Sequence, residues 1–258
     1  MPVTDAKPQA AISVRAVAKT FDGGIRALEG VSFEVPRAQF VSVLGPSGCG
    51  KSTLLRMIGG LFPADHGGQI DVLGRRQDAP SPEVGIVFQT HNMLPWLTVE
   101  KNISLAAEIR GIAAAEIAER TTKILEVLRL DSFRKAYPHE LSGGMRQRAA
   151  FGQILILRPQ VLLLDEPFGA LDALTRDQLN VELLRLWEQQ KQTVILITHS
   201  IAEAVFLSDR VLVMSDRPGR IIADIAIHYP HPRDPQTIRA LPEFTAHVLE
   251  LSQMMGVV

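Results

Sequence analysis

The chain has 258 residues, 46% of them hydrophobic, which is enough for one large or two small packed domains. Its 27 basic and 28 acidic side chains nearly cancel, so the charge balance does not point to nucleic acid or an anionic membrane surface as a partner. No apolar run approaches the roughly 18 residues that span a bilayer, and the N-terminus lacks the basic and then apolar pattern of a secretion signal. The sequence therefore predicts a soluble or peripheral protein, not an integral one.

Four regions can be distinguished along the chain. Residues 1–11 are expected to form a disordered tail, and residues 12–258 a folded unit. Short β-prone runs around a glycine turn predict an antiparallel sheet over residues 12–36. Residues 90–150 are mainly helical and lack the strand alternation found on either side, which indicates an inserted helical subdomain. Residues 228–258, which begin with a Pro- and His-rich stretch and end in a helix, are interpreted as a C-terminal extension.

The strongest motif is GPSGCGKST, residues 45–53, which follows an apolar strand-like run and opens a helical one. It matches the phosphate-binding loop at all four fixed positions, so a glycine-rich turn without a ligand is the weaker alternative. Its glycines allow successive N–H groups to converge on phosphate oxygens. Lys51 would reach the β- and γ-phosphates, and the Ser52 hydroxyl would bind Mg²⁺. The residues expected to bind the nucleotide here are Gly45, Pro46, Ser47, Gly48, Cys49, Gly50, Lys51, Ser52 and Thr53. Cys49 is the single cysteine, so no internal disulfide can form.

Two later strands end in side chains that carry chemistry. The apolar run 161–164 is followed by Asp165 and Glu166, and the apolar run 193–198 is followed by His199. Because ligands bind at the carboxyl ends of parallel strands, Asp165 would hold a metal ion and Glu166 would orient or deprotonate a water molecule. A carboxylate pair after a strand more often caps a helix, and a lone histidine is usually structural. The phosphate loop upstream favours the functional interpretation.

Three further signals are weaker and leave two interpretations each. Gln89, at the tip of a buried strand, suits a metal ion or water, although a lone glutamine is usually just a surface residue. Ser142, Gly143 and Gly144 open a helix and resemble a second anion site, although a capped helix with a flexible start has the same pattern. Phe21 would stack on a base if exposed, and is a core residue otherwise.

In chain order the motifs are GPSGCGKST, Gln89, LSGGM followed by RQR, VLLLDEP, GALD and the pair Thr198-His199. As an ordered set they resemble the nucleotide-binding subunit of an ABC transporter, and the resemblance covers nearly all of residues 12–227. It implies an α/β fold: a P-loop NTPase core of ABC type with an antiparallel β subdomain and an inserted α-helical subdomain.

The resemblance also implies roles for residues. Glu166, His199 and Lys51 would be catalytic, and Ser52, Gln89 and Asp165 would bind Mg²⁺. ATP would lie between two copies of the chain, held by the loop of one and by Ser142, Gly143 and Gly144 of the other. Phe21 would stack on adenine, and the remaining nucleotide-binding residue would be Asp172 of GALD.

Two segments, FQTHNMLPWLTVEKNI and MSDRPGRI, are similar to the nitrate, sulfonate, taurine and bicarbonate importers within that family. Gly169 and Ser200 depart from the commoner pattern, in which Ser and Asp stand at these places, and this bears on the dimer interface, not on activity. The implied partners are a second copy of the chain, integral permease subunits and, indirectly, an extracytoplasmic substrate-binding protein. The location implied is the cytoplasmic face of the cell membrane.

Other functions remain open on the sequence alone. One is an ABC ATPase of another transporter class, for export or lipid trafficking. Another is a non-transport ABC ATPase of DNA repair or translation, which the single cassette, the absence of a long coiled-coil insertion and the lack of basic bias disfavour. An unrelated P-loop kinase would not explain LSGGM or His199.

Overall fold

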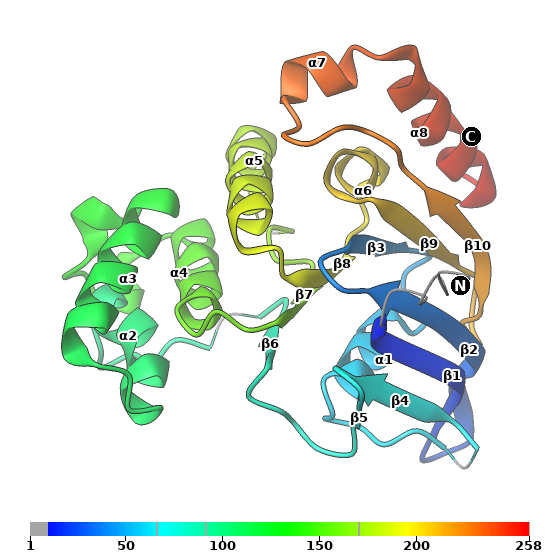
Figure 1. Ribbon diagram of the computed structural model, residues 1–258, viewed down its shortest axis with the longest axis horizontal. Coiled ribbons are helices and arrows are strands. Elements are labelled where there is room, and N and C mark those ends of the chain that lie inside the picture. The colour runs from blue at the N-terminus through cyan, green and yellow to red at the C-terminus, as the bar shows by residue number, and fades with distance from the viewer. Residues whose placement is uncertain (1–9, 66, 91, 170, 258) are drawn as a thin grey trace, which may run out of the picture.

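The computed structural model describes residues 10–65, 67–90, 92–169 and 171–257. In this part of the chain the strands form two sheets (Figure 1). The first is antiparallel, has the order β2-β1-β4-β5, and consists of β1 (Ala10–Phe21), β2 (Ile25–Pro36), β4 (Gln69–Val72) and β5 (Arg75–Arg76). The second has the order β10-β9-β3-β8-β7-β6 and consists of β3 (Phe40–Leu44), β6 (Val84–Val87), β7 (Val161–Asp165), β8 (Thr193–Ile197), β9 (Arg210–Met214) and β10 (Ile221–Ala226).

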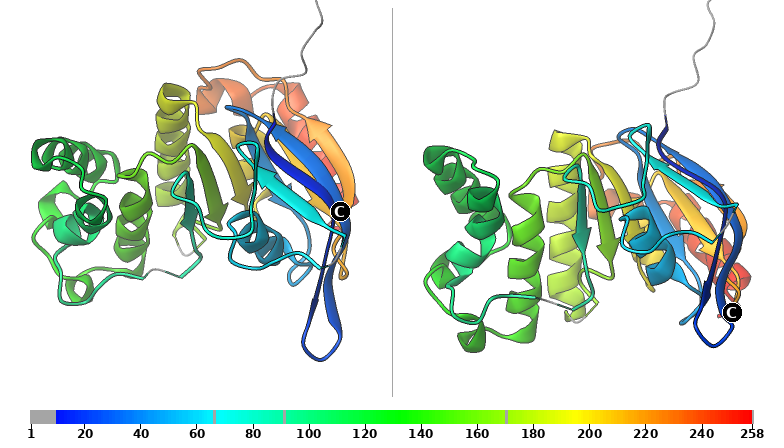
Figure 2. Two further views of the ribbon diagram at one scale, coloured as in Figure 1. Left: turned by 60° about the horizontal axis from the view of Figure 1, so that its bottom comes forward. Right: turned by 90° about the horizontal axis from the view of Figure 1, so that it is seen from below.

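Helices cover both faces of the second sheet, and further helices lie beyond one of its edges (Figures 1 and 2). Helix α1 (Lys51–Ile58) packs between the sheets, in contact with β2 and β4 of one and with β7 and β8 of the other. A group of helices lies beyond β6, namely α2 (Val99–Ile109), α3 (Ala114–Val127) and α4 (Gly143–Leu155). The face away from α1 carries α5 (Ala173–Gln190), α6 (Ile201–Leu207), α7 (Pro235–Arg239) and α8 (Pro242–Met254).

The second sheet forms because its central strands are continuous apolar runs. Strands β3, β7 and β8 are buried along their whole length, as expected for parallel strands with helices on both faces. Alternate side chains enter two cores. Phe40, Leu162 and Val194 pack toward α5 and α6, whereas Val41 and Ile195 pack toward α1. The predicted fold class is therefore confirmed. None of the helices in the described ranges is long and apolar enough to cross a bilayer.

The register of this sheet aligns the ends of its strands. Strand β3 is parallel to β8 with Val43 opposite Ile197, and β7 is parallel to β8 with Asp165 opposite Ile197. Strand β6 is parallel to β7 with Val87 opposite Leu164. The segments that follow these strands therefore leave the sheet at one edge, which brings the phosphate loop, Gln89, Glu166 and His199 together.

Some elements differ from the prediction. Ala10 and Ala11 belong to β1, and Ala11 is fully buried, so strand pairing begins slightly before the expected end of the tail; residues 1–9 lie outside the described residues. Strands β4 and β5 were not predicted, because runs of four and two residues are too short to give a periodic signal. Helix α7 was likewise not predicted between the prolines of the C-terminal segment.

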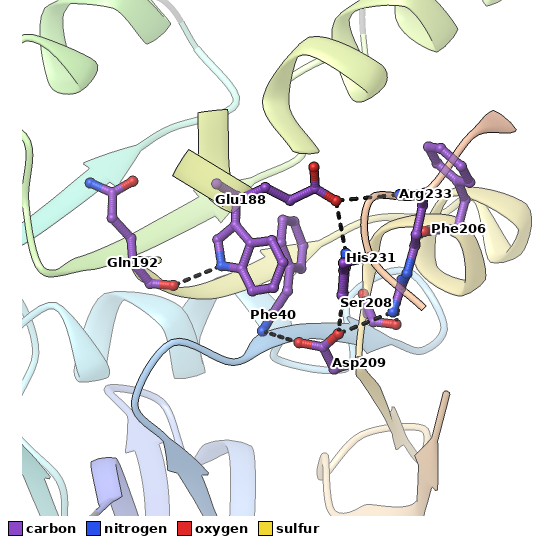
Figure 3. Close-up of polar contacts among 9 residues, drawn as sticks. Phe40, Glu188, Gln192, Phe206, Ser208, Asp209, His231 and Arg233 are labelled. Atoms are coloured by element: carbon purple, nitrogen blue, oxygen red, sulfur yellow. Dashed lines mark hydrogen bonds and ion pairs between the residues drawn. The ribbon is translucent and has the colours of Figure 1, made fainter. Parts of the chain in front are cut away.

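A largely buried polar cluster holds the C-terminal segment on the second sheet (Figure 3). Asp209, which precedes β9, accepts a hydrogen bond from the backbone N–H of Phe40 at 3.0 Å. His231 lies between two carboxylates, with Nδ1 at 2.9 Å from Glu188 and Nε2 at 3.0 Å from Asp209. Arg233, whose side chain is fully buried, donates to Asp209 at 3.0 Å. The segment that leads to α7 and α8 is thus attached to the start of β3 and the end of α5.

Candidate functional site

A cavity of about 340 Å³ lies at the sheet edge where the strand ends meet. Its lining combines residues of the first sheet, the phosphate loop, the strand ends and the turn between β9 and β10: Phe21, Ile25, Ala27, Ser47, Gly48, Gly50, Lys51, Ser52, Thr53, Gln89, Glu166, His199 and Arg217. Most of the sequence-predicted nucleotide and catalytic residues therefore face one space.

The phosphate loop curls over the start of α1. Gly48 and Gly50 have φ angles of +76° and +106°, in the left-handed region that favours glycine. Gly50 is the N-cap of α1, so the first N–H groups of this helix point toward the loop. The Lys51 ammonium donates to the carbonyl oxygens of Gly45 at 2.7 Å and Pro46 at 2.8 Å, which holds its charge inside the curve of the loop. Gly45, Pro46 and Cys49 do not line the cavity, and the Cys49 side chain is buried. The loop has the charge and N–H groups that bind phosphate.

Asp165 and Ser52 lie in contact behind the loop. The Ser52 hydroxyl donates to Asp165 Oδ1 at 2.9 Å. Burial raises the pKa of the Asp165 carboxyl, the Ser52 hydrogen bond lowers it, and the neighbouring Glu166 charge raises it further. A buried carboxylate beside a hydroxyl and a second carboxylate is a set of oxygen ligands that suits a divalent cation.

Glu166, at the end of β7, is held in place by contacts of both its carboxylate and its backbone. Its Oε1 lies 2.5 Å from His199 Nε2, and its Oε2 accepts a hydrogen bond from Gln89 Nε2 at 3.2 Å. Its backbone has a φ of +48°, an unusual conformation for a residue with a Cβ. The peptide is fixed there by Glu166 N–H donating to the carbonyl of Ile197 and by Gln147 Nε2 donating to the Glu166 carbonyl. This carboxylate faces the cavity in a defined orientation, as a general base requires.

The remaining predicted residues lie elsewhere. Ser142 is the N-cap of α4, as predicted, and its Oγ accepts from Met145 N–H at 3.2 Å. Asp172 caps α5 in the same way, accepting from Thr175 N–H at 3.0 Å. Neither these residues nor Gly143 and Gly144 line the cavity. Within one chain the two halves of the predicted ATP site are therefore separate, and Figure 1 shows α4 on the far side of β6 from α1.

Three lining residues were not predicted: Ile25, Ala27 and Arg217. Ile25 and Ala27 follow the hairpin turn after Phe21, a residue that is 36% exposed and whose ring packs edge-on against Phe62. Arg217 comes from MSDRPGRI, a segment whose sequence carries a family resemblance but no signal for a nucleotide contact.

Glu203 supports the segment that carries His199. It is 8% exposed, its carboxylate accepts from the Thr198 hydroxyl, and its N–H donates to Ser200 Oγ at 3.2 Å. Burial, the largest effect, raises the pKa of Glu203, while hydrogen bonds from Thr198 and Asn180 lower it. The folded state consequently binds a proton here more tightly than the unfolded state does.

Replacing Glu203 by glutamine is expected to stabilise the protein at neutral pH. The stability associated with a raised carboxyl pKa is fully present below the ordinary value of 4.5 and is lost as the pH rises through the folded-state value. The neutral amide removes that loss and still accepts from Thr198. We expect Glu203→Gln to melt a few degrees higher than the wild type near pH 7, with the difference closing as the pH falls toward 4.5. A gain that grows on acidification would contradict this.

The fold and the site define a P-loop ATPase with a strand-end carboxylate and histidine facing the phosphate loop. The chain belongs to the ABC transporter family, whose model matches residues 28–169. It is an ABC ATPase that binds and hydrolyses ATP.

Known relatives and structures extend this match over most of the chain. An aliphatic sulfonates import ATP-binding protein, SsuB of Bacillus cereus, is 43% identical over 250 residues, 96% of this chain and 98% of the relative. The taurine import ATP-binding protein TauB of Rhizobium johnstonii is 44% identical over 224 residues, 85% of each chain. A dimeric structure of the bacterial ABC transporter cassette MJ0796 superimposes with a TM-score of 0.76 at 31% identity, covering 85% of this chain and all of that one. A second dimeric structure of that cassette, in a post-hydrolysis state bound to ADP and Pi, gives 0.75 at 28% identity over 85% of this chain and all of that one.

Proposed function

We propose that this chain is the ATP-hydrolysing subunit that energises import of a small anionic solute, of the nitrate, sulfonate, taurine or bicarbonate type, from the cytoplasmic face of the cell membrane. The observation that carries the proposal is the near full-length similarity to sulfonate and taurine import subunits in a chain whose nucleotide cavity has its catalytic side chains assembled. Export, lipid trafficking and non-transport roles are the alternatives that the experiment below tests.

The roles proposed for the residues follow from their chemistry. Phe21 stacks on adenine, the loop N–H groups and Lys51 bind the phosphates, and Glu166 accepts a proton from the attacking water. His199, in contact with Glu166, stabilises charge on the departing γ-phosphoryl group. Asp165, Ser52 and Gln89 supply the oxygens that fit Mg²⁺, which would neutralise phosphate charge when bound.

A second copy of the chain would complete the ATP site. The support is that Ser142, Gly143 and Gly144 are accessible at the start of α4 yet outside the cavity, and that the related cassette is a dimer. ATP between the copies would hold them together through its γ-phosphate, and hydrolysis would release them. This closing motion would drive permease subunits, contacted through the stretch Leu94 to Thr98, while an extracytoplasmic binding protein supplies solute. We assign the helical subdomain to residues 90–150 and the C-terminal extension to 228–258.

The dimer is tested by placing a negative charge at Gly143. A Cβ there would meet only the end of the Arg146 side chain, at 3.9 Å, so Gly143→Asp is expected to leave the fold intact. Its carboxylate would repel the partner's γ-phosphate. We expect Glu166→Gln to dimerise with ATP in light scattering and Glu166→Gln/Gly143→Asp to stay monomeric while still binding ATP, with Gly143→Ala as the neutral control. Dimerisation of the aspartate form would argue against this interface.

The function is tested by uptake of labelled nitrate, taurine, an alkanesulfonate and bicarbonate in cells whose only copy is wild type or Glu166→Gln. We expect uptake of one of these solutes to collapse in the variant. If none changes while the purified wild type hydrolyses ATP, the importer proposal is wrong and the alternatives gain support.

A further inference from the structure

The turn of residues 215–220, between β9 and β10, lies against the phosphate loop and has no role in the mechanism above. Its Arg217 donates two hydrogen bonds to one acceptor, the carbonyl oxygen of Gly48, from Nε at 3.0 Å and from Nη2 at 2.8 Å. Arg217 also lines the nucleotide cavity, and its side chain is exposed. A guanidinium fork with both bonds on one backbone carbonyl is a directed contact with the loop.

The backbone of the turn is fixed to the same loop. A Cβ on Gly219 would lie 2.2 Å from the carbonyl oxygen of Cys49, so only glycine allows this approach. Gly219 N–H donates to the carbonyl of Ala27 at 2.9 Å, and Glu29 N–H donates to the carbonyl of Gly219 at 3.1 Å. The turn thus joins the phosphate loop to β2, whose Ile25 and Ala27 form another wall of the cavity.

This contact fixes the orientation of a phosphate-loop peptide. In a trans peptide the carbonyl and the next N–H point in opposite directions. Arg217 holds the Gly48 carbonyl on one side of this peptide, and on the other side the Cys49 N–H donates to the carbonyl of Pro46 at 3.4 Å. Gly48 has a φ of +76°, and glycine at this position rotates freely when nothing holds it. The hydrogen bond from the Cys49 N–H is long, so the two shorter, charge-assisted bonds from Arg217 are the main restraint on this peptide.

Arg217 also brings charge to the cavity. Lys51 is the other Lys or Arg in the lining; the residue is 5% exposed, and its ammonium group donates to loop carbonyls. In the described part of the chain Arg217 has no carboxylate partner, and its Nη1 makes no hydrogen bond. Arg220, three residues later, pairs instead with Glu29 and does not line the cavity. Arg217 is thus a cation at the cavity wall with a donor left for an anionic ligand.

We propose that Arg217 is a positioning residue of the nucleotide site, which holds the Gly48–Cys49 peptide and thereby increases the affinity of the loop for the phosphates of ATP. The proposal rests on the assignment of the cavity as the ATP site. The contact between Arg217 and the loop would stabilise bound ATP equally before and during hydrolysis. The proposal therefore predicts an effect on KM and little effect on kcat.

Two substitutions separate the hydrogen bond from the charge. Glutamine places its Nε2 where arginine has Nε, and so keeps one neutral donor to the Gly48 carbonyl. Lysine keeps the charge but has a methylene group, and not a donor, at the position of Nε. Losing the fork altogether is expected to raise both the Kd and the KM for ATP about 10-fold in Arg217→Ala, with kcat within about 2-fold of wild type. Arg217→Gln should recover more of the affinity than Arg217→Lys, because the proposal assigns the main effect to the directed bond.

The measurement is calorimetric titration of the full chain with ATP and Mg²⁺, together with steady-state hydrolysis and melting without nucleotide. Arg220→Gln is the matched control, and we expect its Kd, KM and kcat to equal those of the wild type. Equal Kd values for Arg217→Ala and the wild type overturn the proposal, as does a loss of kcat at constant KM. A wild-type chain that fails to bind ATP would instead refute the assignment of the cavity, so the two failures are distinguishable.

Discussion

Replacing Glu166 by glutamine is expected to lower kcat for ATP hydrolysis by about 10²–10³-fold while changing the Kd for ATP by less than about 2-fold. Glutamine has the size and shape of glutamate, so it preserves the packing of the strand end. Its amide oxygen can still accept from Gln89, and its NH2 group then takes the position of the oxygen that faces His199 Nε2. What it loses is the ability to take a proton from water. Binding and hydrolysis should therefore separate, with ATP bound and the dimer closed but not turned over.

Phosphate release and ATP titration on the same preparation measure this separation. Glu182→Gln is the matched control, because Glu182 is a carboxylate on α5 that pairs with Arg185 at 2.8 Å and does not line the cavity. It should hydrolyse ATP at the wild-type rate. If Glu166→Gln does so too, the general base is another group. If it fails to bind ATP, Glu166 contributes to the ground state and not to the proton transfer alone.

The site was largely predictable because its residues stand at strand ends. A glycine-rich loop after one apolar run and polar residues after the others place Lys51, Glu166 and His199 at one sheet edge once the strands are taken as parallel. That reasoning is local in sequence and needs no distances. The separation of Ser142 from this edge follows equally from its place in the helical region.

Arg217 was not predictable in this way. It lies in a turn between two antiparallel strands at the edge of the sheet, and its partner, Gly48, is far away in sequence. Nothing in DRPGR indicates which loop the guanidinium contacts. The glycine at 219 is informative only when the carbonyl of Cys49 is seen 2.2 Å from where its Cβ would be. Such contacts require the tertiary structure.

The elements of the fold also divide into those that local sequence predicts and those that depend on tertiary contacts. Helix α5 has local signals of the predictable kind, because Asp172 caps its start and buried apolar side chains recur as far as Trp187. Strand β4 was not predicted because its two buried side chains, Ile70 and Val72, are stabilised by pairing with β1 and not by a periodic run of its own. The cluster around Asp209 and Arg233 was also missed, since charged residues in a polar, proline-rich stretch are normally exposed.

Replacing Arg233 by alanine is expected to destabilise the protein by about 2–4 kcal/mol, because a buried carbonyl left without its donor costs about 1–3 kcal/mol. Burial lowers the pKa of the guanidinium, which is held in place by the Asp209 charge and by two carbonyls, those of Phe206 and Ser208, each at 2.9 Å. Alanine would leave both carbonyls without their donor. Asp209 Oδ1 would lose the bond from Arg233 and keep only its contact with His231. Lysine cannot reproduce the fork, so Arg233→Lys should recover only part of the loss.

Arg239 in α7 provides the comparison, because it belongs to the same C-terminal segment but pairs with Asp177 at the surface, where both side chains are partly exposed. We expect Arg239→Ala to cost about 1 kcal/mol or less. Urea unfolding measures both variants, and hydrogen exchange over residues 228–257 distinguishes release of the segment from global unfolding. Equal losses for Arg233→Ala and Arg239→Ala would mean that the buried cluster does not hold the segment in place. Fast exchange in the segment with normal ATP hydrolysis would show that α7 and α8 are attached by this cluster and are not needed to form the nucleotide site.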